Sequence, residues 1–123
     1  MQLRDAKPNI FYPGHWGCFG GAIDEGEEPY NALIRELEEE IELTPKKIEK
    51  FIDVEFNFSI LGLDKVRRHY FIVPIEDSDL DRITLHEGTS YKFFNGKDLL
   101  YNFKLTPYDS FAIWTHINKF RFK

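Results

Sequence analysis

Residues 21–43 read GAIDEGEEPYNALIRELEEEIEL, and this stretch decides the fold. Its second half has the spacing of an amphipathic helix, because Leu33, Leu37 and Ile41 recur every four residues. Pro29 suits the first helical position, where its missing backbone N–H leaves no hydrogen bond unmade. We therefore predict a helix that begins near Pro29 and packs on the domain through this aliphatic stripe.

The opposite face of this predicted helix is strongly acidic. Five of the seven residues 36–42 are glutamates, and Arg35 is the cation beside them. Like charges three or four residues apart on a helix repel by about 0.2–0.5 kcal/mol per pair. Helical spacing turns four of these side chains away from the stripe: Arg35, Glu36, Glu39 and Glu40. A solvated acidic surface is one interpretation, but the glycine turn upstream favours a binding site.

With its upstream glycines, the stretch resembles the Nudix box. That motif reads Gly, five residues, Glu, seven residues, Arg-Glu, an aliphatic residue, one residue, Glu-Glu, one residue, Gly and an aliphatic residue. The matching positions are Gly21, Glu27, Arg35, Glu36, Leu37, Glu39, Glu40 and Leu43, and Glu42 replaces the final glycine. The resemblance implies an α/β (α+β) fold, a Nudix-like α/β/α sandwich with helices packed on a mixed β-sheet. It also implies one Nudix hydrolase domain over residues 1–123.

The resemblance to the Nudix family further implies an enzyme. It would be a magnesium-dependent pyrophosphohydrolase that cleaves a nucleoside diphosphate linked to another group, with water attacking phosphorus. The segment ahead of the glycine turn, with Arg4, Lys7-Pro8 and Trp16, resembles that of family members that hydrolyse nucleotide sugars, and this resemblance favours a nucleotide sugar as the small-molecule substrate. The alternative is a catalytically silent Nudix-fold module that binds a nucleotide or regulates. A plain acidic interaction domain would leave the glycine spacing unexplained.

The resemblance assigns roles within the box. Glu39 and Glu40 are the expected metal ligands, and Glu36 is either a further ligand or the base that takes a proton from water. A backbone carbonyl of the glycine turn, that of Gly20 or Gly21, could complete the set, since magnesium prefers hard oxygen ligands. Mn²⁺ could substitute for magnesium. Glu27 and Arg35 would form an ion pair that fastens the glycine loop to the helix.

Glu42 is the departure from the motif. A left-handed conformation at the end of the helix costs a residue with a side chain about 1–2 kcal/mol. Either Glu42 accepts this strain, or the helix continues until Pro45 disfavours helical geometry at Thr44. Glu38 and Glu42 are expected to be solvated surface residues.

A second acidic candidate lies far along the chain. Some members of the Nudix family draw an additional catalytic acid from a distant loop, and the resemblance makes Glu87 the candidate for it. An ordinary polar turn residue beside Gly88 is an equal interpretation of Glu87. His86 is adjacent and could act as a base. Three weaker acidic candidates precede it: Glu76, Asp77 and Asp79.

The substrate-binding candidates are Arg4, Tyr12 and Arg67. Arg67 and its neighbours Lys65 and Arg68 follow a hairpin turn, where charges commonly serve solubility alone. Aromatic rings near Tyr12 could stack on a base, whereas core packing is the preferred interpretation of Trp16.

The remaining elements follow from periodicity and turn residues. Residues 51–60 alternate apolar and polar side chains, and this pattern predicts a half-buried strand that returns through residues 66–75. Shorter strands are predicted at 1–4, 16–19 and 90–94, with a brief helix at 96–101. A final helix begins at Thr106-Pro107, and residues 76–82 are predicted to be a loop.

Composition excludes several classes of function. The chain has 123 residues and a net charge of −5, which argues against general nucleic-acid or anionic-membrane binding. Its single cysteine, Cys18, excludes an internal disulfide. No apolar run is long enough to span a membrane, and the absence of a leader favours a cytoplasmic protein. Members of the family that the box resembles usually carry a further strand-length segment ahead of residues 2–4. Either the start of this sequence is late, or the sheet lacks one strand and has an exposed edge, and such an edge would favour a homodimer.

Overall fold

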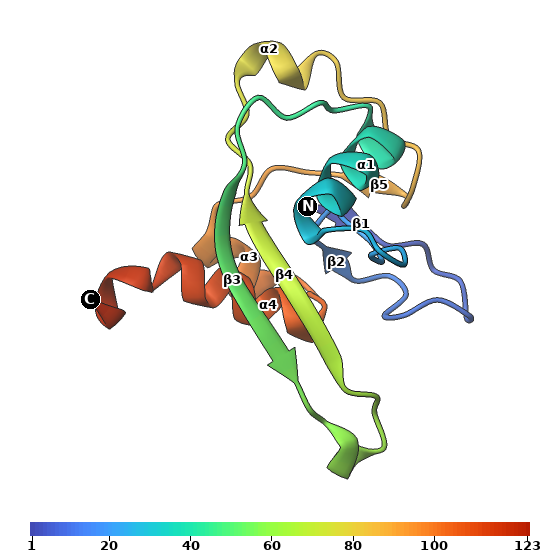
Figure 1. Cartoon of the computed structure of the whole chain (residues 1–123), viewed down its shortest axis with the longest axis vertical. Helices are drawn as coiled ribbons and strands as arrows, with labels where there is room; N and C mark the ends of the chain where they lie inside the picture. Colours follow the sequence, from blue (N-terminus) through green and yellow to red (C-terminus); the bar gives the residue numbers. More distant parts are fainter.

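The computed structural model describes all 123 residues and has the expected α/β (α+β) composition of strands and helices (Figure 1). The strands are β1 (Gln2–Leu3), β2 (Trp16–Gly17), β3 (Glu49–Phe56), β4 (Val66–Ile72) and β5 (Ser90–Tyr91). The α-helices are α1 (Pro29–Ile41), α2 (Asp77–Leu80), α3 (Gly96–Asn102) and α4 (Pro107–Ile117). Two 3₁₀ turns, η1 (Ser59–Leu61) and η2 (Lys119–Phe122), complete the chain. None of the helices is long and apolar enough to cross a bilayer.

The strands form two antiparallel sheets. One is a small sheet in the order β2-β1-β5, and the other is the long hairpin of β3 and β4. Parallel pairing is limited to an isolated bridge between Trp16 and Leu105. Figure 1 shows α3 and α4 behind the β3–β4 hairpin. Helix α1 lies to one side of the hairpin, over the small sheet. The N-terminal strand β1 is paired on both sides, with β2 and with β5, so the uncovered edge expected near the N-terminus is not present there. The homodimer itself stays a prediction.

Helix α1 forms as its spacing predicts. It begins at Pro29, and Leu37 and Ile41 are buried together with Leu43 just beyond its end. Leu33 packs against this cluster as a half-buried residue. Burial of one such aliphatic side chain contributes about 1.5–3 kcal/mol, and it fixes α1 and its acidic face on the domain.

The predicted hairpin strands are shorter than expected. β3 ends at Phe56, opposite Val66, and η1 replaces the rest of the predicted strand. Asn57 accepts a hydrogen bond from the Ser59 backbone N–H at 3.2 Å, which turns the chain out of the sheet. Ile60 is therefore 93% exposed. The returning strand ends at Ile72 because Pro74 cannot donate to a sheet.

The prediction of a loop over residues 76–82 was wrong. Residues Asp77–Leu80 form α2, which a capping box stabilises. Glu76 accepts from the third residue of the helix, and the Asp79 carboxylate accepts from the Glu76 backbone N–H at 2.9 Å. These reciprocal hydrogen bonds satisfy N–H groups that would otherwise be unpaired.

Candidate functional site

The glycine turn before α1 is joined to the helix through a buried carboxylate. Gly20 has φ of +133°, and its N–H donates to Glu40 Oε2 at 3.0 Å. Glu40 is only 2% exposed, although its position was expected to turn it away from the buried stripe. The physical reason is that residue 40 lies three positions after Leu37 and seven after Leu33, on the flank of the stripe, where the glycine turn covers it.

Gly21 allows a second carboxylate to approach the turn. A Cβ at this position would lie 2.5 Å from the carboxyl carbon of Glu36, closer than real contacts permit. The Glu36 carboxylate therefore packs directly against the backbone of Gly21. Any side chain at residue 21 would displace Glu36.

Glu40 is also in contact with the late candidate Glu87. Burial of Glu40 raises its pKa from 4.5 to about 8. A hydrogen bond with Glu87 and the negative charges of Glu87 and Glu36 raise this pKa further, whereas the hydrogen bond from the Gly20 N–H lowers it. The structure thus brings together three carboxyl groups from two distant segments. So much negative charge beside a buried group favours either a bound proton or a bound cation.

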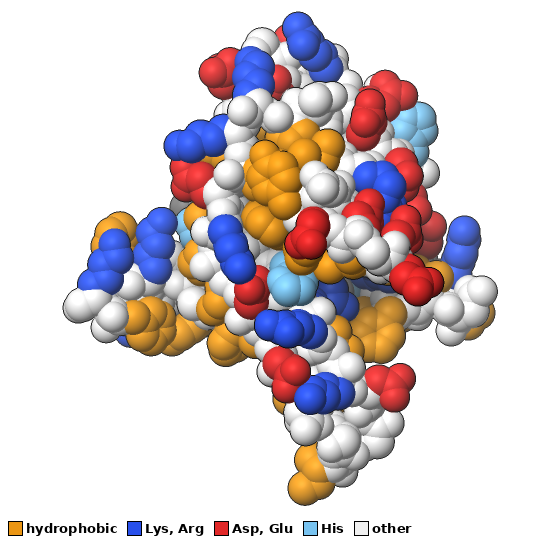
Figure 2. Space-filling model, viewed as in Figure 1, with side chains coloured by type: hydrophobic (Ala, Val, Ile, Leu, Met, Phe, Trp, Pro, Cys, Tyr) orange, Lys and Arg blue, Asp and Glu red, His pale blue; other side chains and the backbone are white.

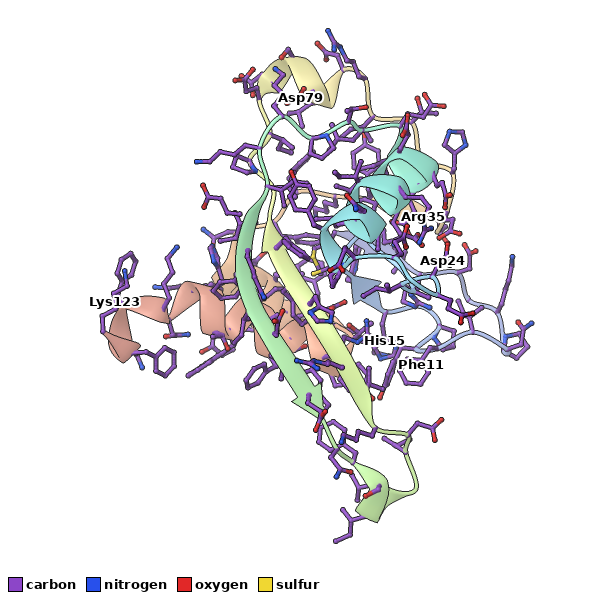
Figure 3. All side chains as sticks on the ribbon, in the orientation of Figure 1. Phe11, His15, Asp24, Arg35, Asp79 and Lys123 are labelled. Carbon is purple, nitrogen blue, oxygen red and sulfur yellow. The ribbon has the colours of Figure 1, made fainter.

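Arg35 ties the loop to the helix, and the expected ion pair with Glu27 is present. Its Nη2 and Nε lie 2.8 and 2.9 Å from the two Glu27 oxygens, Nη2 also donates to the Ala22 carbonyl at 3.0 Å, and Nη1 donates to Glu36 at 2.8 Å. These hydrogen bonds lower the pKa of Glu27 to about 2 and raise the pKa of Arg35. Figure 3 shows Arg35 on α1 directed at the loop that carries Asp24.

Glu39 lies at the margin of this acidic centre. Its side chain is 60% exposed, and its nearest cation is Arg35 at 3.4 Å. No three acidic, histidine or cysteine side chains are gathered closely enough to chelate one ion. The chemistry of the donors nevertheless fits a hard divalent cation, because they are carboxylate oxygens that lie directly against the backbone of Gly21.

Glu42 adopts the left-handed conformation that the motif's glycine would take. Its φ is +55°, and its N–H donates to the carbonyls of the last helical turn, so α1 ends at Ile41 and does not continue to Pro45. Glu42 was expected to be a solvated surface residue, but its carboxylate lies 2.7 Å from His86 Nε2. The Thr84 and His86 N–H groups donate to the Ile41 and Glu40 carbonyls at 3.1 and 2.8 Å. These contacts fasten the Glu87 loop to the end of α1.

Replacing Glu42 with glycine is expected to separate stability from activity. Glycine removes a backbone cost of about 1–2 kcal/mol, but it also removes the contact with His86 that holds the Glu87 loop. We expect a stability equal to or above that of the unchanged protein and a kcat several-fold lower, with KM unchanged. Urea unfolding and steady-state kinetics measure both quantities. Glu42→Gln, which keeps an acceptor for His86, should retain the kcat, and an undiminished kcat in Glu42→Gly would contradict the fastening role.

A cavity of about 510 Å³ adjoins the glycine turn. Arg4 and Arg67 line it, as does Arg68, whereas Tyr12 does not. Tyr12 instead contacts the rings of Phe11, His15 and Tyr108. Figure 2 shows acidic side chains gathered over α1, with basic side chains close by at the hollow beside the β3–β4 hairpin. The other acidic candidates lie elsewhere: Asp79 caps α2, distant from Arg35 in Figure 3, and Glu76 pairs with Lys46 at 2.9 Å.

The sequence did not indicate the role of Asp109, a buried residue that lines the cavity. Its carboxylate accepts from the Cys18 N–H at 2.9 Å, the Thr106 hydroxyl at 2.7 Å and the Tyr70 hydroxyl at 3.0 Å. These donors come from the residue that follows β2, from β4 and from the residue that caps α4, so one buried carboxylate on α4 joins three parts of the fold. Burial raises the pKa of both Cys18 and Tyr70, and Cys18 is thus a neutral, unreactive thiol.

The fold and this site define an α+β domain in which Glu36, Glu40 and Glu87 gather beside the glycine turn that precedes α1. A sequence model of the NUDIX domain matches residues 3–111, and the chain belongs to the Nudix family. This confirms the resemblance drawn from the box. Nudix hydrolases generally use divalent metal ions.

Three relatives with named activities are similar to this chain. An RNA pyrophosphohydrolase of Helicobacter pylori (strain P12) is 32% identical over 105 residues, covering 77% of this chain and 66% of that protein. The corresponding protein of strain ATCC 700392 / 26695 is 33% identical over 97 residues, covering 71% and 63%. An 8-oxo-dGTP diphosphatase of Escherichia coli (strain K12) is 44% identical over 39 residues, covering 32% and 30%. The chain therefore spans slightly less than two thirds of the length of the Helicobacter relatives.

Proposed function

We propose that this protein is a magnesium-dependent pyrophosphohydrolase that cleaves a phosphoanhydride bond of a nucleotide by attack of water on phosphorus. The observation that carries the proposal is the burial of Glu40 between the glycine turn and two further carboxyl groups, Glu36 and Glu87. A module that only binds nucleotides gains nothing from this repulsion. The enzyme is therefore favoured over the silent Nudix-fold module.

The residues divide into three roles in this proposal. Glu36, Glu39 and Glu40, with the carbonyl of Gly21, would hold Mg²⁺ or Mn²⁺. The bound cation would neutralise negative charge on the phosphate oxygens, which is the chemistry that hydrolysis of an anhydride requires. Glu87, which contacts Glu40, would accept a proton from the attacking water, and Glu36 is the alternative base. Arg35 and Glu27 hold the glycine turn and act on the reaction only through position.

The relatives bear on the choice of substrate. One kind of relative is named for RNA and another for 8-oxo-dGTP, a nucleoside triphosphate. Neither name specifies the nucleotide sugar that the segment before the glycine turn suggested. We propose a substrate with a chain of phosphates, and a nucleotide sugar becomes the comparison compound.

A substrate panel with and without chelator tests the proposed function. The purified protein is incubated with 8-oxo-dGTP, 5′-triphosphorylated RNA, a dinucleoside polyphosphate and a nucleotide sugar, and the released phosphate and pyrophosphate products are measured. We expect hydrolysis of at least one compound with Mg²⁺ or Mn²⁺, and none after chelation with EDTA. Hydrolysis that continues in EDTA, or no product from any member of the panel with metal, would contradict the proposal.

A further inference from the structure

The part of the chain from α4 onward exposes aromatic rings and positive charge together. Residues 110–123 contain three lysine and arginine side chains and no acidic one, in a chain whose net charge is −5. We propose that this surface binds single-stranded nucleic acid, with bases stacked on its rings and phosphates held by its cations. The inference goes beyond the proposed function, because the surface lies outside the acidic centre and does not depend on hydrolysis.

The exposed apolar residues at this surface are all aromatic. They form the aromatic patch, which consists of Phe111, Trp114, Phe120 and Phe122. The Trp114 and Phe122 rings lie 6.0 Å apart and are inclined at 59°. The aliphatic side chains of the same segment, Ile113 and Ile117, are half-buried. Exposed rings without exposed aliphatic neighbours fit the flat faces of bases, whereas a bilayer surface also takes up aliphatic side chains.

Positive charge stands beside the aromatic patch. It comes from three side chains that form no ion pair: Lys119, Arg121 and Lys123. The Lys119 and Lys123 ammonium groups lie 5.7 and 5.5 Å from the centre of the Phe120 ring. Glu49 is already paired with Lys47, which lowers its pKa, and the charge of Lys119 adds to this effect. Rings and cations thus alternate on one surface, as bases and phosphates do along a single strand.

Helix α4 connects the aromatic patch with the cavity but keeps the two apart. It begins where Tyr108 and Asp109 line the cavity, and its 11 residues extend about 16 Å away from there. None of the four rings of the patch lines the cavity. Figure 3 shows Lys123 across the molecule from Arg35 and Asp24, and Figure 2 shows basic and hydrophobic side chains mixed over this end. A strand bound to the patch is therefore held away from the acidic centre, which would repel it.

The first test measures binding without hydrolysis. A short fluorescein-labelled oligouridylate without a 5′-phosphate is titrated with the protein in EDTA, and fluorescence anisotropy gives the Kd. We expect Trp114→Ala to raise the Kd about 10-fold or more, because stacking of a base on a ring has effects of this size. Trp114→Phe, which keeps a ring, should retain most of the affinity. An equal Kd in Trp114→Ala and the unchanged protein would overturn the inference.

Phe93→Ala is the matched control for the aromatic patch. Phe93 is an exposed ring that follows β5, and Figure 1 shows β5 across the molecule from the C-terminus. We expect its replacement to leave the Kd unchanged. If Trp114→Ala does not fold, Phe122→Ala takes its place with the same expected direction.

The second test measures the contribution of the cations. Three phosphate contacts on a single strand give a slope of about −2 in a plot of log K against log salt concentration. Replacing Lys119, Arg121 and Lys123 together with glutamine should remove most of this slope. The control variant replaces three exposed lysines that form ion pairs elsewhere and changes the net charge equally: Lys46, Lys47 and Lys65. The same slope in both triple variants would contradict phosphate contacts at the patch.

Two further probes identify the class of partner. A duplex of the same length hides the faces of its bases, so we expect it to bind about 10-fold more weakly than the single strand. Equal affinity for both would contradict stacking on the rings. Binding to phosphatidylserine vesicles without binding to the oligouridylate would overturn the inference and assign the patch to a membrane surface. The proposed hydrolysis would stand in either case, since it is measured separately at the acidic centre.

Discussion

Replacing Glu40 with glutamine is expected to lower hydrolysis of the nucleotide substrate by about 100-fold or more, because charge stabilisation at a buried site has effects of this size. Glutamine has the shape of glutamate, and its amide oxygen can still accept from the Gly20 N–H. It lacks the negative charge through which residue 40 would hold a cation. Steady-state kinetics at saturating Mg²⁺ measure the loss.

Glu38→Gln is the matched control for this substitution. It removes one negative charge from the same helix at an exposed position that makes no contact with the acidic centre. We expect it to keep nearly full activity. A Glu40→Gln protein with more than half of the original rate would contradict the assignment of Glu40.

The same substitution should change how stability depends on pH in the metal-free protein. In the folded state the pKa of Glu40 is raised from 4.5 to about 8, so between these values the folded state binds a proton that the unfolded chain has released. The free energy of unfolding therefore falls as pH rises from 4.5 to 8. Glu40→Gln removes this decline. Thermal unfolding in EDTA should show that Glu40→Gln is more stable than the unchanged protein at pH 8 and equally stable at pH 4.5. A variant less stable than the unchanged protein at pH 8 would contradict a buried carboxyl group with a raised pKa.

Asp109→Ala is expected to lower the free energy of unfolding by about 3–5 kcal/mol, because removing one partner from a buried charged network leaves the others unsatisfied. The orphaned groups would be the Cys18 N–H and the hydroxyls of Tyr70 and Thr106. Urea unfolding measures the loss. Asp64→Ala, at an exposed position in the turn of the hairpin, should change stability by no more than about 0.5 kcal/mol. A loss below about 1 kcal/mol in Asp109→Ala would show that this network does not hold β2, β4 and α4 together.

The parts of the fold that could be predicted are those with local signals. A proline at the first position and an aliphatic stripe predict helix α1. The end of β3 has no such local signal. Apolar and polar residues continue to alternate through Ile60, but the partner strand β4 begins at Val66, opposite Phe56, so β3 ends there. Helix α2 was missed because its acidic residues look like a loop until Glu76 and Asp79 cap each other.

The candidate site divides in the same way. The spacing of the box indicated Glu36, Glu40 and the Glu27–Arg35 pair, and the structure brings all of them to the glycine turn. The burial of Glu40 was missed because it depends on the glycine turn covering the flank of α1. The role of Asp109 in joining distant segments could not be predicted from the sequence, because its hydrogen bond from the Cys18 N–H joins residues 91 positions apart.

Binding of a divalent cation by the acidic face of α1 is tested most directly by titrating Mn²⁺ into the purified protein and following its electron paramagnetic resonance signal. We predict saturable binding that Mg²⁺ displaces, that Glu40→Gln greatly weakens and that Glu38→Gln leaves unchanged. Mn²⁺ that stays free in solution, or that binds Glu40→Gln as tightly as the unchanged protein, would contradict a metal site between the glycine turn and α1.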